Sequence, residues 1–454
     1  MAKFIMNKVK TGLIILLSGL AIYLTSQLWF VKISSRNFFY YMFEHTNTLH
    51  HDLENERTLA WPFRLITNYG GNRFTIQYSG LGTCELREIC DSIMVSLLRD
   101  GVAIGVQELD YEEIFSSRGY IFEYAFNMPL SALGMAYGRA FSDDLTHITA
   151  IAFIPSIEHH EETIVWLLDE ESMKMSGYSV PMPLPPVTGG PPRSDQVIIY
   201  NSSILSRHDF GSRNVFIAGF TEEGYRYPIL NIVNPYAENE LLMGVIEQHI
   251  NVFFENPSAK RSFMGEHNVF TYNDRSTVVR YFQNNVLEYS KYRTGIGEVG
   301  LVRSFNIALN FIESDAFVVD EFYLAGFEQI NNEFIFYFDY IIENLPLILP
   351  DELIGSDLPS GHTTINHAIE VTVREGLVVN YRKIVYNFIP DTISHRTRLD
   401  FNSILPGVLE PLNETGESIS SILLGYKIEQ SQTANLYWAI HYSSDDQYLF
   451  KRAR

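Results

Sequence analysis

The feature that most constrains this chain is an uncharged run of 21 residues, from Thr11 to Val31. As a helix it would span about 31 Å at about 1.5 Å per residue, which matches the thickness of a bilayer's hydrocarbon core. Three lysines precede the run, and no small-residue cleavage site of the signal-peptide kind follows it. We therefore expect residues 11–31 to form a retained transmembrane helix, preceded by a short tail of residues 1–10.

The distribution of charge gives this predicted helix an orientation. Three basic residues lie before the run and two, Lys32 and Arg36, lie just after it. This difference favours a cytoplasmic N-terminus, with the bulk of the chain outside a single-pass cell membrane. The whole chain has a formal net charge of −21. Such acidity argues against a nucleic-acid surface, which needs basic patches.

The predicted transmembrane helix has two different faces. Leucines occupy one side, which lipid would satisfy, while small and hydroxyl residues gather on the other with two isoleucines between them. Small residues let a second helix approach closely, and hydroxyl groups can form hydrogen bonds across the contact. The predicted helix–helix interface consists of Thr11, Gly12, Ile15, Ser18, Gly19, Ala21, Ile22, Thr25 and Ser26.

The remainder of the chain divides by composition into a connector and three predicted domains. The polar connector covers residues 32–60, and the first domain covers 61–194, with a helix from Thr83 to Arg99 and a proline-rich linker at its end. The second and third domains are predicted at 195–295 and 296–454.

A recurring pattern predicts the fold class of these outer domains. Three segments read as a helix followed by aromatic, β-rich strands, with the helices at 238–254, 300–314 and 416–430. Residues 368–388 add a hairpin with its turn at Glu375–Gly376. The sequence therefore predicts an α+β fold, with helices packed on largely antiparallel sheets.

Sites for chemistry are weak in this sequence. Cys84 and Cys90 would lie about 9 Å apart along a helix, too far for an unstrained disulfide. Adjacent clusters such as residues 158–161 point in different directions, and the common phosphate, zinc-protease and nucleophile motifs are absent from the sequence. We predict no catalytic residue, no metal site and no cofactor.

Two alternatives remain open at this point. With 54 acidic residues, an anchored envelope hydrolase with an unrecognised carboxylate pair is possible on sequence alone. A module that binds a wall fragment or a lipid is the other alternative, using the surplus of 31 Phe and 27 Tyr.

Two segments resemble a known family. Residues 253–292 are similar to the YycH (WalH) regulatory proteins of Gram-positive bacteria, and the matching positions are Phe254, Pro257, Ser258, Arg261, Tyr272, Asp274, Glu288 and Tyr289. A second match joins FDYIIENLPLILP with HAIEVTVREGLVVNYRKIVYNF further along. A basic N-terminus, one span and a long outer region also agree with that family. The matching motifs look structural rather than catalytic.

The resemblance implies a function in signal transduction. The family consists of accessory proteins of an essential two-component system that controls cell-wall metabolism. Its members bind a YycG (WalK)-like sensor histidine kinase and a smaller companion, YycI (WalI), through transmembrane helices and outer domains. We therefore expect a membrane-anchored, non-catalytic regulator of such a kinase.

Overall fold

The computed structural model describes residues 59–78, 85–141, 145–156, 159, 161–192, 194, 197–205, 215–219, 224–234, 242–265, 269–292, 295, 297–315, 321–349, 363–409, 418–429, 433–442 and 448–453. None of the helices within these ranges is both long and apolar enough to cross a membrane. The predicted tail, the transmembrane helix predicted at 11–31 and nearly all of the predicted connector lie outside the described residues.

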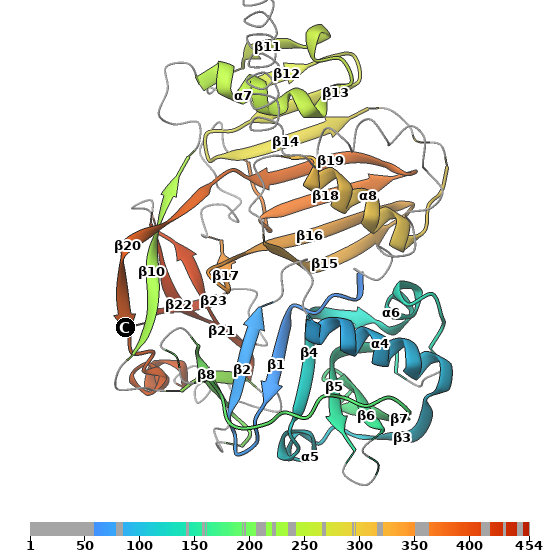
Figure 1. Ribbon diagram of the computed structural model, residues 1–454. Coiled ribbons are helices and arrows are strands. Elements are labelled where there is room, and N and C mark those ends of the chain that lie inside the picture. The colour runs from blue at the N-terminus through green and yellow to red at the C-terminus, as the bar shows by residue number, and fades with distance from the viewer. Residues whose placement is uncertain are drawn as a thin grey trace, which may run out of the picture. The chain divides into compact units, whose positions relative to one another are not determined.

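Nine strands of the first half of the chain form one antiparallel sheet (Figure 1). In spatial order they are β3 (Val102–Glu108), β7 (Lys174–Val180), β6 (Thr163–Asp169), β5 (His147–Pro155), β4 (Gly119–Pro129), β1 (Arg64–Asn68), β2 (Phe74–Tyr78), β8 (Ile199–Ser202) and β9 (Phe216–Ala218). The middle strands are rich in β-branched and aromatic residues, which suit a pleated and buried surface. Trp166 covers its cross-strand neighbour Gly177, where a side chain would collide with the indole ring.

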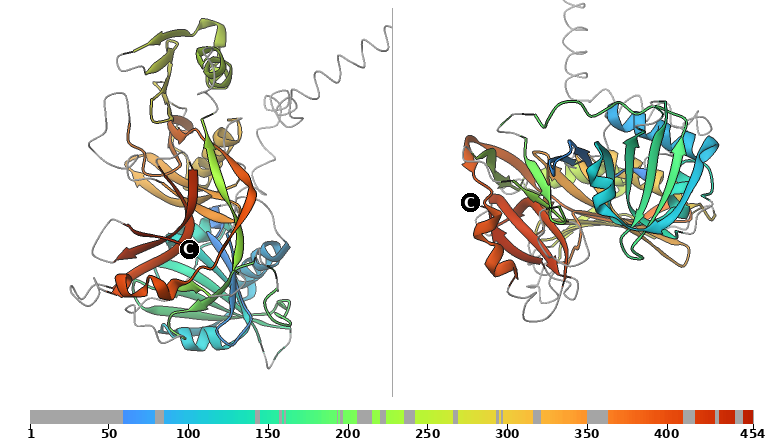
Figure 2. Two further views of the ribbon diagram at one scale, coloured as in Figure 1. Left: turned by 90° about the vertical axis from the view of Figure 1, so that its left-hand side faces the viewer. Right: turned by 90° about the horizontal axis from the view of Figure 1, so that it is seen from below.

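Three helices accompany this first sheet, namely α4 (Glu85–Asp100), α5 (Tyr111–Ser116) and α6 (Leu130–Ala136). The predicted helix at 83–99 is confirmed, because α4 covers residues 85–100. Its buried residues, among them Cys90, Ile93 and Leu97, recur at helical spacing, and α4 packs against β7 (Figure 2). Thr83 and Cys84 lie outside the described residues.

The second sheet has fourteen strands from the rest of the chain. Its path runs through β11 (Arg261–Met264), β12 (Phe270–Asn273), β13 (Thr277–Tyr281), β14 (Val286–Lys291), β19 (Leu377–Ile384), β18 (Ile369–Arg374), β16 (Glu333–Ile342), β17 (Leu345–Ile348), β21 (Ile419–Ile428), β22 (Thr433–Tyr442), β10 (Tyr225–Val233) and β20 (Asn387–Thr397). Two strands branch from this path: β15 (Phe322–Ile330) pairs with β16, and β23 (Tyr448–Arg452) pairs with β22. Among the described pairings only β17 with β21 is parallel. The predicted fold class, a mixed α+β fold built on largely antiparallel sheet, is therefore confirmed.

The part of the second sheet that runs from β11 to β15 is called the eight-stranded section, and its strands follow the order β11-β12-β13-β14-β19-β18-β16-β15. The helices near it are α7 (Leu242–Ile250), α8 (Leu301–Glu313) and the short 3-10 turns η2 (Asn251–Phe253) and η3 (Pro257–Ala259). A third 3-10 turn, η5 (Phe401–Ser403), follows β20. Helix α8 lies on β16, β18 and β19 (Figure 1).

The contact of α8 with the sheet is aromatic. Phe305 packs edge-on against Phe336 of β16, with ring centroids 5.4 Å apart, and Phe311 packs against Tyr381 of β19 at 5.2 Å. Tyr289 of β14 lies 5.0 Å from Phe311. These side chains all belong to one face of the eight-stranded section, which is thereby the covered face.

The predicted hairpin at Glu375–Gly376 is confirmed. It joins β18 to β19, and both turn residues have positive φ, at 50° and 79°. That backbone geometry is typical of a type I′ turn, whose twist matches that of the flanking strands. The helices predicted at 238–254 and 300–314 also correspond to α7 with η2 and to α8.

The helix predicted at 416–430 is wrong, because residues 419–428 form strand β21 between β17 and β22. The register with β22 shifts between Ile419 and Ser421, which marks a bulge. One extra residue places two buried side chains, Ile419 and Ile422, three positions apart and so imitates a helical period. Beyond the bulge, Ile422, Leu424, Tyr426 and Ile428 alternate as a strand requires.

The predicted division of the outer part into three domains stays a prediction. All described residues belong to one compact unit, Glu56–Arg454. Strands β8 and β9, at residues 199–218, pair with the first sheet beyond β2, although the sequence placed these residues in the second domain.

A buried ionic cluster fastens the helices to the covered face. The carboxylate of Asp315, just after α8, contacts His249 Nε2 of α7 at 2.7 Å through Oδ1. Its Oδ2 lies 2.5 Å from Nζ of Lys383 and accepts a hydrogen bond of 2.9 Å from the Tyr381 hydroxyl. Three elements, α7, α8 and β19, therefore meet at one fully buried carboxylate.

The charge states of this cluster follow from burial and pairing. Burial alone would raise the pKa of Asp315, but the charge of Lys383 and the hydrogen bond from His249 hold the pKa of this carboxyl well below its usual range. Burial lowers the pKa of His249, which favours a neutral imidazole. Lys383 is thus the main positive charge that balances this anion.

We predict that Lys383→Met lowers the free energy of unfolding by about 3–5 kcal/mol, because it leaves a buried carboxylate without its cation. The double variant Asp315→Asn with Lys383→Met removes both charges and should lose clearly less. Urea denaturation of the three proteins measures both effects. Equal losses in the single and double variants would contradict this account of the cluster.

Candidate functional site

The face of the eight-stranded section opposite α8 is here called the open face, because no described helix packs on it. Successive side chains of a strand point to opposite faces, so neighbours of the covered residues belong to the open face. Glu288 precedes the covered Tyr289, Arg382 follows the covered Tyr381, and Tyr337 lies between two buried phenylalanines. The open face is consequently polar and charged around these positions, whereas Val286 and Ile384, which follow the same alternation nearer one end of their strands, are fully buried.

One row of directly paired residues crosses the open face through all eight strands. Its members, from β11 to β15, are Phe263, Thr271, Arg280, Glu288, Arg382, Glu370, Tyr337 and Gly326. Direct partners in an antiparallel pair share a face, and their side chains contact one another. This central row places four charged residues in the middle, in the order positive, negative, positive, negative.

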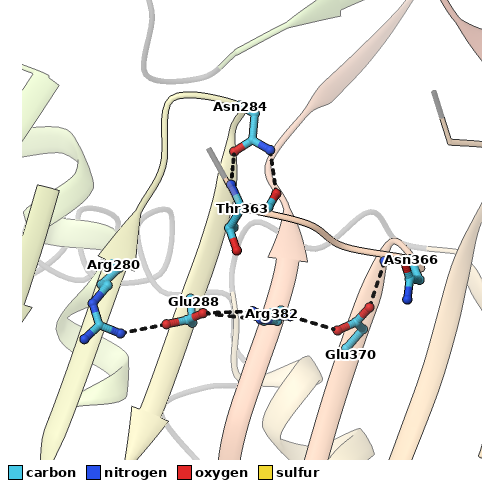
Figure 3. Close-up of polar contacts among 7 residues, drawn as sticks. All are labelled: Arg280, Asn284, Glu288, Thr363, Asn366, Glu370 and Arg382. Atoms are coloured by element: carbon cyan, nitrogen blue, oxygen red, sulfur yellow. Dashed lines mark hydrogen bonds and ion pairs between the residues drawn. The ribbon is translucent and has the colours of Figure 1, made fainter. Parts of the chain in front are cut away.

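The four charges form a continuous chain of ion pairs (Figure 3). Arg280 Nη1 lies 2.7 Å from Glu288 Oε1, and two nitrogens of Arg382 donate to Glu288 Oε2 at 3.3 Å each. Arg382 Nη1 lies 3.7 Å from Glu370 Oε2, and Glu370 also accepts a 2.9 Å hydrogen bond from the backbone of Asn366. Each carboxylate is held by more than one donor.

These ion pairs are half-exposed rather than buried. The side chains of Arg280 and Arg382 keep 37% and 34% of their surface accessible, and those of Glu288 and Glu370 keep 15%. Half-exposed pairs of this kind contribute little stability, at most about 1 kcal/mol each. Their main effect is to fix the direction of charged groups at the surface.

A second row runs beside the central row on the same face and is called the flanking row. From β11 to β15 its members are Arg261, Asn273, Val278, Ser290, Asn380, Thr372, Ile335 and Glu328. It is mostly uncharged, with one basic residue at the β11 end and one acidic residue at the β15 end. The two rows together are formally neutral in a chain of net charge −21.

An asparagine ties the end of the β13–β14 turn to the segment that precedes β18 (Figure 3). Asn284 Nδ2 donates to the carbonyl of Thr363 at 2.7 Å, and its Oδ1 accepts from the backbone N–H of Thr363 at 3.4 Å. This pair of hydrogen bonds mimics one rung of a sheet. It holds residues 363–368 beside the strands that carry the ion pairs.

A histidine–aspartate pair lies beside the part of the central row that crosses β18 and β16. His367 Nδ1 is 2.9 Å from Asp339 Oδ2, the N–H of Ala368 donates to Asp339 Oδ1 at 2.8 Å, and the His367 ring lies 4.9 Å from that of Tyr337. Burial alone would lower the pKa of His367, but the hydrogen bond and charge of Asp339 outweigh it and raise that pKa above its ordinary value.

The structure places the family-motif residues around β11–β14 in two roles. Phe254, Tyr272 and Tyr289 are buried, whereas Pro257 and Ser258 lie exposed in η3 and Arg261 is exposed at the start of β11. Asp274 caps the β12–β13 turn, where one carboxylate oxygen accepts from the N–H groups of Ser276 and Thr277 at 2.7 Å. Of the eight, Arg261 and Glu288 lie on the open face. The predicted helix–helix interface at 11–26 lies outside the described residues.

Sequence reasoning missed Arg280, Arg382, Glu370, Asp339 and His367 as members of one site. All five lie inside the two segments that resemble the family, but in separate stretches of the chain. Opposite charges on β14 and β19 become neighbours only through a strand pairing that joins residues 94 positions apart. The alternation of side chains within each segment could be seen in the sequence, whereas the register between β14 and β19 could not.

The open face is suited to recognition of a polar surface. Each of the four charged groups in the central row already has an opposite charge beside it, so none is presented as a lone proton donor or acceptor. Fixed, alternating charges define a pattern that a complementary surface can match, which favours specificity over affinity.

Comparisons with known proteins find similarity among solved structures. No protein-family profile and no curated protein sequence matches the chain. Among solved structures, the crystal structure of YycH from Bacillus subtilis is similar to it, with a TM-score of 0.49 and 12% sequence identity. The match covers 86% of this chain and 95% of that chain. The matched protein bears the name of the family that residues 253–292 resemble.

We predict that the His367–Asp339 pair stabilises the protein mainly below about pH 6.5. The pKa of His367 is raised from 6.5 in the folded state, so its contribution is fully present below the unfolded pKa and is lost as the pH rises through the folded pKa. The difference in free energy of unfolding between wild type and His367→Gln, from urea titrations at pH 5.5 to 8, should therefore shrink with rising pH. Asp339→Asn should weaken this pH dependence, because it removes the largest favourable contribution to the raised pKa of His367. A difference that grows with pH would contradict the assignment.

Proposed function

We propose that this chain is a membrane-anchored, non-catalytic regulator of an envelope sensor histidine kinase. The observation that carries the proposal is the meeting of two distant segments on one surface. Residues 253–292 and the strands that include Glu370 and Arg382 each resemble the same regulatory family. The pairing of β14 with β19 joins them, and their charged side chains form the central row.

The character of the open face supports a contact function. Its charges are ordered and half-exposed, and they alternate in sign over four adjacent strands. Such a surface can distinguish partners by electrostatic fit, because like charges brought together are strongly unfavourable. A regulator that works by binding needs this kind of discrimination more than it needs a reactive group.

Regulation through contact has a simple energetic form. A kinase that exchanges between two states shifts toward the state that the regulator binds more tightly, by an amount set by the difference in binding free energy. In this proposal the open face contacts the kinase's outer part, and the helix at 11–31 contacts its membrane span. A companion protein of similar layout is the second partner of the proposed assembly.

The first test concerns the open face. We predict that Arg382→Glu lowers the amount of histidine kinase captured from membranes by the full-length chain several-fold, because it places three negative charges side by side. Arg99→Glu, at an exposed ion pair on α4, is the matched control and should leave capture unchanged. The measurement is quantitative mass spectrometry after affinity capture. Capture that is equal for wild type and Arg382→Glu would count against the open face.

The second test concerns the predicted transmembrane helix. We expect replacement of Ser18, Gly19 and Thr25 by leucine to weaken association with the kinase span, since large side chains prevent close approach of the helices. Replacement of Leu13, Leu16 and Leu20 by other large apolar residues should have little effect. A membrane two-hybrid assay compares the two sets, and equal effects would refute the two-faced helix.

A further inference from the structure

The order of charges on the open face is complementary to itself. Read across the sheet, the central row carries Arg280, Glu288, Arg382 and Glu370, which is positive, negative, positive, negative. Reversing this order exchanges every sign. We propose that the open face is the contact surface between two copies of this chain, related by a two-fold axis parallel to the strands between β14 and β19.

The axis generates specific partners across the contact. Rotation by 180° about it lays β14 of one copy over β19 of the other, so that Glu288 faces Arg382 of the second copy. In the same way Arg280 faces Glu370 of the second copy. Each charged residue thus keeps its lateral ion pairs and gains an opposite charge in front of it. A two-fold contact is self-complementary by definition, and the row meets that requirement.

The same two-fold axis also brings opposite charges of the flanking row together. The rotation lays β11 over β15, so that Arg261, the one basic residue of this row, faces Glu328, its one acidic residue. The exposed ring of Phe263, with 48% of its surface accessible, faces Gly326, which has no side chain to obstruct it. The remaining partners are uncharged. Two independent rows therefore favour the same axis.

Other two-fold arrangements are opposed by the same charges. An axis along the central row would lay every residue on its own copy, with arginine on arginine and glutamate on glutamate. An axis that passes through β14 would lay Glu288 on itself and Arg280 on Arg382. Like charges that face each other across a close contact are destabilising. The charge order therefore selects both the direction and the position of the axis.

The overall charge of the chain points to the same face. Two copies of a protein with a net charge of −21 repel one another over most of their surfaces. The central and flanking rows carry three basic and three acidic residues, so these two rows together are formally neutral. A second copy can approach there without the general repulsion.

The expected contact is small and reversible. Eight strands about 4.8 Å apart span roughly 34 Å, but sheet twist confines close approach to the middle strands. The buried area then falls below the roughly 800 Å² per partner of a standard stable interface. A weak dimer that dissociates as salt rises is the expected result. This inference stands on the charge order alone and does not rest on the proposed regulation of a kinase.

The decisive experiment is a charge-reversal mixing test with the full-length chain in detergent. Energy transfer between two separately labelled pools reports self-association at low salt. We expect wild type to associate, and Glu288→Arg alone and Arg382→Glu alone to lose at least tenfold in affinity. An equimolar mixture of the two variants should regain it, because each new charge then faces its opposite. Mixing cannot repair an ion pair inside one chain, so this rescue reports a contact between copies.

Two additions keep the result decisive. The double variant Glu288→Arg with Arg382→Glu should associate like wild type, although its internal order of charges is scrambled. Arg261→Glu and Glu328→Arg, at exposed positions at the ends of the flanking row, give the same mixing test without disturbing the internal ion pairs. A mixture that stays monomeric in both tests, or single variants that associate like wild type, would overturn the dimer. Loss of the dimer in Arg261→Glu or Glu328→Arg, together with kinase capture that is unchanged for these two variants, would leave the proposed function standing.

Discussion

The antiparallel pairing of β14 with β19 is the contact on which the second sheet depends. It joins residues 286–290 to residues 380–384 and so connects the hairpins of β11–β14 to the strands of β15–β19. This register determines which side chains of β14 and β19 meet on the covered face and which meet on the open face. Tyr289 and Tyr381 meet on the covered face against α8, while Glu288 and Arg382 meet on the open face.

The buried cluster at Asp315 explains why this register is firmly held. A shift of β19 by one residue would turn Lys383 and Tyr381 out of the core and bring Arg382 into it. Asp315 would then lie buried without its cation, a change of several kcal/mol, whereas the half-exposed pairs of the open face are worth far less. The inner cluster therefore determines the register, and the outer row of charges follows from it. The positions of the surface charges thus depend on an interaction that is fully buried.

Sequence reasoning recovered what local patterns encode. Strand β16, the β18–β19 hairpin and helices α4 and α8 were predictable because alternation, turn residues and helical spacing act within a few residues. The strand at Ile419–Ile428 was mistaken for a helix because one bulge shifts its alternation by a single residue. The central row was invisible because it depends on pairings between residues far apart in the chain. Glu288 was identified from a family motif, yet the motif alone did not reveal that Arg280 and Arg382 flank it.

A surface that is complementary to itself has a consequence for a protein that also binds others. If the open face holds a second copy and a kinase in turn, the two occupants exclude each other, and binding of one lowers the apparent affinity for the other by mass action. A weak dimer is then an advantage, because little free energy is needed to open it. The same alternating charges would set the specificity of both contacts. A partner that displaces the second copy must present negative and positive groups in the order that the chain itself presents, so the self-contact constrains which proteins can bind.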